Sequence, residues 1–419
     1  MDSTNLKFYN NNNKETIHHI NSLMFERIAG TKGETKAINY IQKELNKENI
    51  ENNVESFEWS RTIKILVNAT TFFIFCSTIL YETIIVLNLA WLMVVLDLIF
   101  IAIIYILVIS FYDMTHLISL GKKKSSKNII ANVPAMEKTH KRPIIIFTAH
   151  YDSISSKYPY NVKRFFLLLV IIISFPYIIS TLFFSEWTIL TYFFDFFKTE
   201  LYTTLMAKSI DFSYVSFLFL IIGITILLFN RERSQSLGAI DNASGVSILI
   251  ELIKILNKNP LKHIDILFLW CGAEEWGLWG SKQFCKKHFN ELDEEYDLDK
   301  SYNINIDMVG TYIGLVNKTG IIKKRDNEKL INILETSAKR LNIPLNKYDL
   351  AVEPRSDHNS FRSFAKKARK KMQVCCFLSN EDTKFIHISR DTPNKCSSKN
   401  LNGCVDICYG AIKSIDLQV

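Results

Sequence analysis

Five side chains that can bind a metal ion are spread along the chain, and each follows an apolar run of the kind that forms a β-strand. They are His150, Asp241, Glu275, Asp307 and His387. Two imidazoles and three carboxylates suit borderline ions such as zinc, and one carboxylate can bridge a pair of such ions. The set favours a hydrolase with two metal ions as the leading interpretation.

Two further carboxylates could take part in the chemistry of such a site. Glu274 precedes Glu275, and adjacent side chains that leave a strand point in different directions, so one can bind metal while the other faces an attacking water. Asp152 lies two residues after His150 and can accept a hydrogen bond from the second ring nitrogen of that histidine. Such a bond would fix the tautomer that binds metal.

Each of these residues also has an ordinary role without metal. The alternatives are an interior histidine for His150, a helix cap for Asp241, an exposed acidic pair for Glu274 and Glu275, and a turn for Asp307. On residue type alone, His358 competes with His387 for the last ligand position.

The pattern of apolar residues predicts the elements that position these groups. Strands are expected at residues 129–133, 143–148, 264–270, 302–306 and 373–378, and helices at residues 34–48, 243–257, 279–289, 326–341 and 358–370. This alternation predicts an α/β fold with a mixed, largely parallel sheet and helices on both faces. Ligands of such sheets gather beyond the carboxyl ends of strands, where His150, Glu274, Glu275 and Asp307 fall.

Apolar residues are concentrated in two blocks, at residues 62–112 and 164–229, in a chain that is 48% hydrophobic. Each block is long enough for two membrane spans of about 20 residues, with Glu82 at the turn of the first pair. Buried core helices are the alternative, but such helices are rarely apolar on every face over this length. We therefore expect a globular domain made of residues 1–61, 113–163 and 230–419, interrupted by two transmembrane helical hairpins.

The basic residues that flank the two blocks predict the orientation. Lys and Arg are concentrated next to the globular segments, at Arg61, Lys64, Lys122, Lys123, Lys124, Lys127, Lys163, Arg164, Arg231 and Arg233. The positive-inside rule then places the globular domain in the cytoplasm and makes the protein a multi-pass protein of the cell membrane. No cleavable signal is recognised in residues 1–60, and the eight cysteines are expected to be free thiols. Asp97, inside a predicted span, could be functional or could pair with a neighbouring helix.

The net charge of +8 and the basic run at residues 366–371 do not indicate nucleic-acid binding, because no nucleic-acid-binding signature accompanies them. A solvated helix end or a patch that faces anionic lipid explains the run better. The expected partners are thus a substrate and the lipid bilayer, and the sequence does not indicate an oligomeric state.

The chain resembles the M28 family of zinc aminopeptidases over its whole globular part. The resemblance is carried by residues 27–34 (RIAGTKGE), the strand that ends in His150, the segment DNASG at Asp241, the segment EEWGLWGS at Glu274, the segment Ser356-Asp357-His358, and His387 followed by Asp391-Thr392. These motifs occur in the family's order. The two apolar blocks depart from secreted members and are similar to membrane-bound ones.

The resemblance implies a ligand set and a function. It implies two zinc ions per chain, one held by His150 and Asp307, one by Glu275 and His387, with Asp241 bridging both. Glu274 would be the general base, with Asp152 beside it in the catalytic machinery. His387 is preferred to His358 as the last ligand, and Asp357 and His358 are placed beside the substrate or behind the ligands. A cis peptide bond between Asp241 and Asn242 is also implied. The expected activity is that of an exopeptidase acting on peptides, first of all an aminopeptidase.

Three other functions stay open at this point. A carboxypeptidase of the same family would need a basic group for the substrate carboxylate, for which Arg355 or Arg390 is available. A glutaminyl cyclase shares the fold but uses one zinc ion. A non-catalytic membrane scaffold or transporter is the alternative of a different class. The absence of an H-E-x-x-H motif argues against thermolysin-like proteases.

Overall fold

The computed structural model describes residues 14–87, 89–112, 119–137, 140–229, 236–320 and 327–419. The chain forms two compact units. The globular unit consists of Met1–Thr62, Met114–Ser156 and Glu232–Val419, and the helical unit consists of Ile63–Asp113 and Lys157–Arg231.

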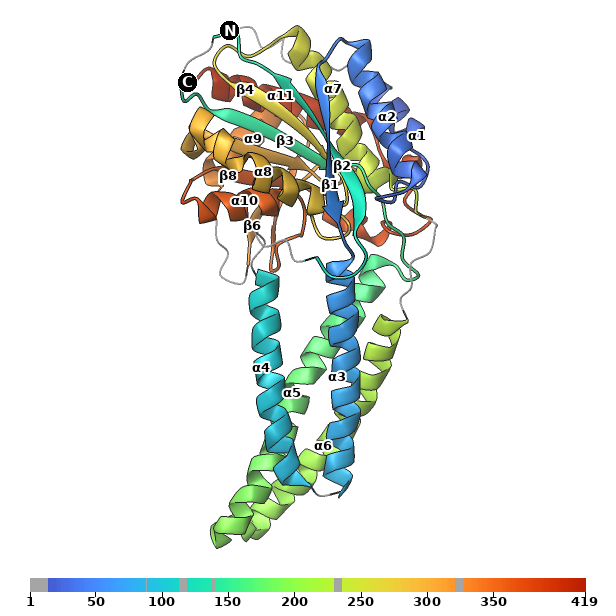
Figure 1. Ribbon diagram of the computed structural model, residues 1–419, viewed down its shortest axis with the longest axis vertical. Coiled ribbons are helices and arrows are strands. Elements are labelled where there is room, and N and C mark those ends of the chain that lie inside the picture. The colour runs from blue at the N-terminus through green and yellow to red at the C-terminus, as the bar shows by residue number, and fades with distance from the viewer. Residues whose placement is uncertain (1–13, 88, 113–118, 138–139, 230–235, 321–326) are drawn as a thin grey trace. The chain divides into compact units, whose positions relative to one another are not determined.

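The globular unit is built on one eight-stranded sheet with the order β1-β2-β4-β3-β5-β8-β6-β7 (Figure 1). The strands are β1 (Asn52–Trp59), β2 (Lys124–Val133), β3 (Ile144–His150), β4 (Asp265–Cys271), β5 (Tyr302–Ile306), β6 (Gly314–Thr319), β7 (Asn346–Leu350) and β8 (Gln373–Phe377). The central strands β4, β3, β5 and β8 are parallel to one another, whereas β1, β2 and β4 pair antiparallel. The predicted α/β class with a mixed, mostly parallel sheet is confirmed.

Helices cover both faces of this sheet. They are α1 (Glu15–Ser22), α2 (Lys32–Lys47), α7 (Ser244–Lys258), α8 (Trp279–Glu295), α9 (Glu328–Leu341), α10 (His358–Lys367) and α11 (Ser398–Asp416). On one face, Ile146 and Leu269 of the central strands form a core with Phe284 of α8 and Phe361 of α10. α7 lies against the strands as well and is covered by α1, α2 and α11. Because successive strand residues point to opposite faces, a continuously apolar strand such as β3 places apolar side chains on both faces of the sheet.

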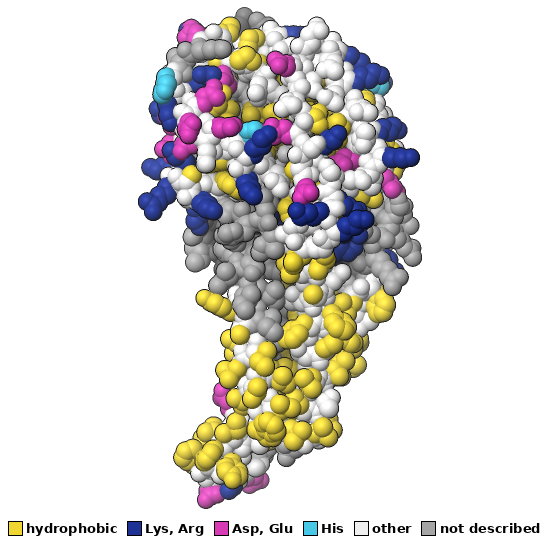
Figure 2. Space-filling view, in the orientation of Figure 1, with side chains coloured by type: hydrophobic (Ala, Val, Ile, Leu, Met, Phe, Trp, Pro, Cys, Tyr) yellow, Lys and Arg dark blue, Asp and Glu magenta, His cyan; other side chains and the backbone are white. Residues whose placement is uncertain are grey.

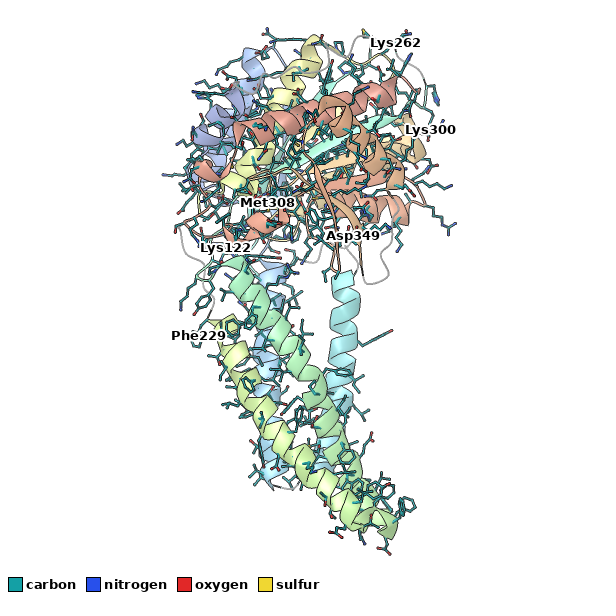
Figure 3. The ribbon with its side chains drawn as sticks, turned by 180° about the vertical axis from the view of Figure 1, so that it is seen from behind. Lys122, Phe229, Lys262, Lys300, Met308 and Asp349 are labelled. Atoms are coloured by element: carbon teal, nitrogen blue, oxygen red, sulfur yellow. The ribbon has the colours of Figure 1, made fainter. Side chains whose placement is uncertain are left out.

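The helical unit contains α3 (Thr62–Leu87), α4 (Ala90–Tyr112), α5 (Tyr160–Phe193) and α6 (Glu200–Leu228). Among the described residues, α3, α5 and α6 are long and apolar enough to cross a membrane. Hydrophobic side chains cover the visible face of this unit, whereas charged side chains are frequent on the globular unit (Figure 2). Phe229, the residue that follows α6, is also exposed (Figure 3).

The helices differ from the predicted spans at the first turn. Glu82 does not lie at a turn but inside α3, which continues to Leu87, and its side chain is buried. The prediction was wrong because a single carboxylate does not end a helix when neighbouring helices cover it. Asp97 of α4 accepts a hydrogen bond from Tyr81 (2.6 Å) and one from Ser185 (3.4 Å), so this carboxylate is paired within the unit. The second apolar block, expected at residues 164–229, forms α5 and α6, and α5 begins before this block, at Tyr160.

Candidate metal centre

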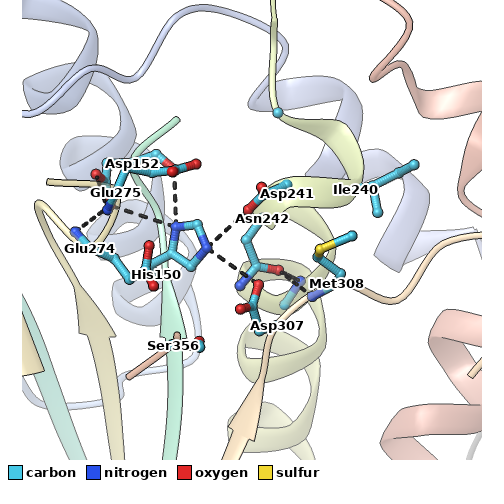
Figure 4. Close-up of polar contacts among 12 residues, drawn as sticks. His150, Asp152, Ile240, Asp241, Asn242, Glu274, Glu275, Asp307, Met308 and Ser356 are labelled. Atoms are coloured by element: carbon cyan, nitrogen blue, oxygen red, sulfur yellow. Dashed lines mark hydrogen bonds and ion pairs between the residues drawn. The ribbon is translucent and has the colours of Figure 1, made fainter. Parts of the chain in front are cut away.

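The candidate ligands meet at the carboxyl ends of the parallel strands, where the sequence places them. His150 is the last residue of β3, and Asp307 follows β5 directly. Glu275 lies in the turn after β4, His387 in the loop after β8, and Asp241 just before α7. Figure 4 shows His150 turned toward Asp241 and Asp307, which come from separate segments.

The five side chains form two groups that share one carboxylate. Nε2 of His150 lies 3.1 Å from Oδ1 of Asp241 and 3.4 Å from Oδ1 of Asp307. Nε2 of His387 lies 3.0 Å from the other Asp241 oxygen, Oδ2, and 3.0 Å from Oε1 of Glu275. The two oxygens of Asp241 therefore face different groups, which is the arrangement of a bridging ligand.

The donor atoms fit a pair of bound cations. Oε1 of Glu275 and Oδ1 of Asp307 are buried and accept no hydrogen bond from any described residue. A buried carboxylate oxygen that accepts no hydrogen bond is costly, and a cation removes that cost. Because one nitrogen and two carboxylates meet in each group, the donor chemistry matches zinc.

Asp241 is held by a network that reaches the end of β5. The peptide bond between Asp241 and Asn242 is cis, as the resemblance implies. The Asn242 amide donates to the carbonyl of Ile306 (2.8 Å), and its oxygen accepts the N–H of Gly245 (2.8 Å). A Cβ at Gly245 would lie 2.4 Å from that Ile306 oxygen, so only glycine allows α7 to approach β5 this closely.

Asp391 supports the same segment from the other side. One of its oxygens accepts the N–H of Ile240 (2.6 Å), and the other accepts the N–H of Asp241 (3.4 Å). Burial raises the pKa of Asp391 to about 7. In the sequence this aspartate is only a family marker, since nothing in its neighbourhood shows that its partners lie about 150 residues earlier.

Asp152 connects the first group to the second. Nδ1 of His150 lies 3.2 Å from the backbone oxygen of Asp152, while the carboxylate stays 3.6 Å away. That carboxylate accepts the backbone N–H groups of Glu274 (3.0 Å) and Glu275 (3.3 Å) instead. The nearest acceptor for the second ring nitrogen is therefore the carbonyl, and the side chain of Asp152 holds the glutamate pair in place.

Glu274 is buried beside the ligands. Burial is the main reason why its pKa is raised well above the usual value, and the carboxylates of Asp357 and Glu275 add to the shift, while His150 opposes it. Asp357 is itself fully buried, which raises its pKa to about 6.

His358 does not join either group of ligands. Its Nε2 lies 3.3 Å from Oε1 of Glu353. The structure thus brings His387, and not His358, to Asp241 and Glu275. Ser356, two residues earlier, accepts a hydrogen bond from Asn305 of β5 (2.7 Å), which fixes this loop near the strand ends (Figure 4).

Arg27 was missed as a residue that builds the site. Its guanidinium is fully buried and donates to the backbone carbonyls of Tyr151 (2.7 Å), Leu237 (2.6 Å) and Gly238 (2.8 Å). Burial lowers its pKa to about 10, although Asp391 acts in the opposite direction. Arg27 ties the segment after His150 to the segment before Asp241. Because all three acceptors are backbone atoms, no side-chain pattern in the sequence could have predicted this role.

The mixed sheet gathers imidazoles and carboxylates at its parallel strand ends, in two groups that could hold metal ions. Residues 225–412 match the sequence profile of peptidase family M28. A segment of 75 residues is 42% identical to aminopeptidase YwaD of Bacillus subtilis (strain 168), and it covers 18% of this chain and 15% of that protein.

Solved structures show the same fold. The aminopeptidase from Aneurinibacillus sp. strain AM-1 superposes with a TM-score of 0.54 at 15% identity, over 95% of this chain and 92% of that one. The zinc aminopeptidase BSAP from Bacillus subtilis gives 0.52 at 15% identity (96% and 94% covered), and a glutaminyl cyclase from an Acidobacteriales bacterium gives 0.52 at 14% identity (97% and 94% covered). Residues 225–412 are thus similar to the peptidases of family M28, and the chain has the aminopeptidase-like fold.

Proposed function

We propose that this protein is an exopeptidase with two zinc ions per chain, and that it acts as an aminopeptidase on peptides. The observation that carries the proposal is the division of the two Asp241 oxygens between two groups, each of which adds one imidazole and one carboxylate. An arrangement for a single ion would not need a shared carboxylate. The name of the Bacillus relative and the names of two solved structures support the aminopeptidase reading.

In this proposal His150 and Asp307 would hold one ion, Glu275 and His387 would hold the other, and Asp241 would contribute one oxygen to each. When bound, the ions act as Lewis acids that lower the pKa of a water molecule and polarise the scissile carbonyl. Glu274 takes the proton of the attacking water and then delivers it to the nitrogen of the leaving amine. Its burial raises its pKa, which suits a carboxylate that must accept a proton in the first step. Asp152 is a positioning residue, because it holds the backbone of Glu274 and Glu275.

The alternatives differ in measurable ways. Purified full-length protein loaded with zinc should contain two zinc ions per chain by mass spectrometry and should release the first residue of an unblocked tripeptide. Acetylation of the peptide's amino group should abolish cleavage. Release of the last residue from the acetylated peptide would instead identify a carboxypeptidase. Cyclisation of an N-terminal glutamine, with one zinc ion per chain, would identify a glutaminyl cyclase. Failure of all three reactions would leave the non-catalytic alternative.

We further propose that the helical unit spans a membrane and that the globular unit lies in the cytoplasm. Three helices have the required length and hydropathy, and large side chains such as Phe175 (71% exposed) and Trp91 (65% exposed) lie on the unit's surface. Exposed apolar surface of this extent is typical of contact with lipid. Substrates would then be cytosolic peptides or the cytosol-exposed ends of membrane proteins.

Cysteine labelling in intact cells tests this orientation. After the native thiols have been removed, a cysteine at Lys198, between α5 and α6, should react with a membrane-impermeant reagent, and a cysteine at Asn380 of the globular unit should not. The reverse pattern would place the globular unit outside the cell, and labelling at both positions would contradict a spanning helical unit.

A further inference from the structure

Two basic side chains of the globular unit are not part of the proposed catalytic machinery, and one of them, Arg355, lies near Glu274. Lys282 is in the first turn of α8, and Arg355 is in the loop that leads to α10. The hydroxyl groups of Ser281 and Ser360 are hydrogen-bonded at 2.8 Å, so the beginnings of the two helices are held together. The positive charges of Lys282 and Arg355 are consequently close enough to repel each other.

Lys282 is buried but has no counter-charge. It is only 7% exposed, and its ammonium makes no hydrogen bond or ion pair with any residue that the structure describes. Burial, followed by the repulsion from Arg355, lowers its pKa to about 8. A lysine side chain that is largely buried loses part of its hydration, and a bound anion would compensate for that cost.

Arg355 is exposed and is likewise free of ion pairs within the described ranges. Its guanidinium is partly shielded from solvent, which lowers its pKa, and the carboxylate of its charged neighbour Glu274 opposes this shift. The other acidic side chains of this region have different partners. Glu353 pairs with Arg362 and lies near His358, and Asp357 is adjacent to Ser281 and Cys271.

We propose that Lys282 and Arg355 bind a carboxylate of the substrate, which makes the centre selective for peptides that carry a negative charge beside the scissile bond. The inference rests on the proposed peptidase function. This pair of donors suits a carboxylate. One donor is the exposed guanidinium of Arg355, which can bind a carboxylate through two parallel hydrogen bonds. The carboxylate could be the C-terminal group of a dipeptide or an acidic side chain of the leaving residue, and both have the same chemistry.

Paired substrates distinguish these two sources. The zinc-loaded full chain is assayed with alanyl-alanine against its C-terminal amide, and with alanyl-glutamate amide against alanyl-glutamine amide. In whichever pair contains the recognised carboxylate, kcat/KM of the acid should exceed that of the neutral partner. Lys282→Met and Arg355→Gln should each lower this ratio about tenfold or more, as expected for a hydrogen bond between charged groups. The matched control is Lys286→Met, an exposed lysine one turn further along α8, which should keep the wild-type ratio.

The ratio of the two kcat/KM values separates carboxylate recognition from a general loss of structure, because misfolding lowers kcat/KM for both substrates of a pair. Equal kcat/KM values for acid and amide in both pairs, or a ratio that the two variants do not change, would overturn the carboxylate site while leaving the peptidase proposal intact. If no peptide is cleaved, the proposed function fails, and binding still decides the inference. Calorimetry with the Glu274→Gln protein should then show tighter binding of alanyl-alanine than of its amide, and Glu274→Gln/Lys282→Met should remove the difference.

Discussion

The two halves of the metal centre have similar donors but different surroundings. The half formed by His150 and Asp307 belongs to the ends of β3 and β5, and these side chains are 2% and 10% exposed. In the other half, Glu275 and His387 come from loops, and His387 is 21% exposed with a left-handed backbone (φ +61°). Ligands fixed at strand ends lose less freedom on binding than ligands on loops. The comparison predicts that the first half would hold an ion more tightly, and it shows that the second half is nearer to the solvent.

The largest effect is expected from the residue that both halves share. Asp241→Ala should lose both zinc ions and all measurable activity, because it removes one ligand from each group. Mass spectrometry of the purified variant measures the zinc content, with the exposed Glu294→Gln as the control that should keep two ions. Retention of one ion per chain would show that Asp241 belongs to one half only.

Glu274→Gln should separate catalysis from metal binding. The amide can neither accept nor donate the catalytic proton as a carboxylate does, so kcat is expected to fall by about 10²–10⁴-fold. Since Glu274 belongs to neither half, the zinc content should remain at the wild-type value. A variant with near-normal kcat would rule out the assigned base, and a variant without zinc would make Glu274 a ligand.

Asp152→Asn should weaken the connection between the halves. The side chain keeps one acceptor oxygen but loses the charge that holds the N–H groups of Glu274 and Glu275. An effect of about 10–100-fold on kcat/KM is expected for a supporting group of this kind. The zinc content and the pH dependence of kcat/KM distinguish this role from simple destabilisation. An unchanged pH profile together with a lowered unfolding temperature would contradict a positioning role.

The smallest effect concerns the order of metal loss. Titration of the wild-type protein with a chelator should release zinc in two phases, and a tenfold separation would correspond to about 1.4 kcal/mol between the halves. His387→Ala should remove the phase that occurs at low chelator concentration, and His150→Ala should remove the other. A single phase in the wild type would mean that strand and loop ligands bind equally well.

The sequence predicts the centre of the sheet and the donor atoms better than it predicts their surroundings. The strands β3, β4, β5 and β8 are almost continuously buried, so their apolar runs are clear. In contrast, β1 and β7 at the edges are largely exposed or half-buried and have no such signal. β6 was also missed, since only its first half is buried.

The supporting contacts of the site are hidden from the sequence for a related reason. Arg27, Asp152 and Asp391 act mainly on backbone atoms of segments distant in the chain. A backbone N–H or carbonyl is present at nearly every position, so the sequence does not show which one a side chain meets. The ligands, by contrast, are recognisable because metal chemistry restricts their side chains to a few types.

The order of synthesis determines when the contacts of Arg27 can form. Its acceptor Gly238 is synthesised 211 residues later, after all four apolar helices of the helical unit. The first piece of the globular unit therefore lacks this contact of Arg27 until the last apolar helix has been made. Because His387 comes later still, a nascent chain that stops within these helices lacks one of the candidate ligands, and the candidate metal centre is complete only after the helical unit has been synthesised.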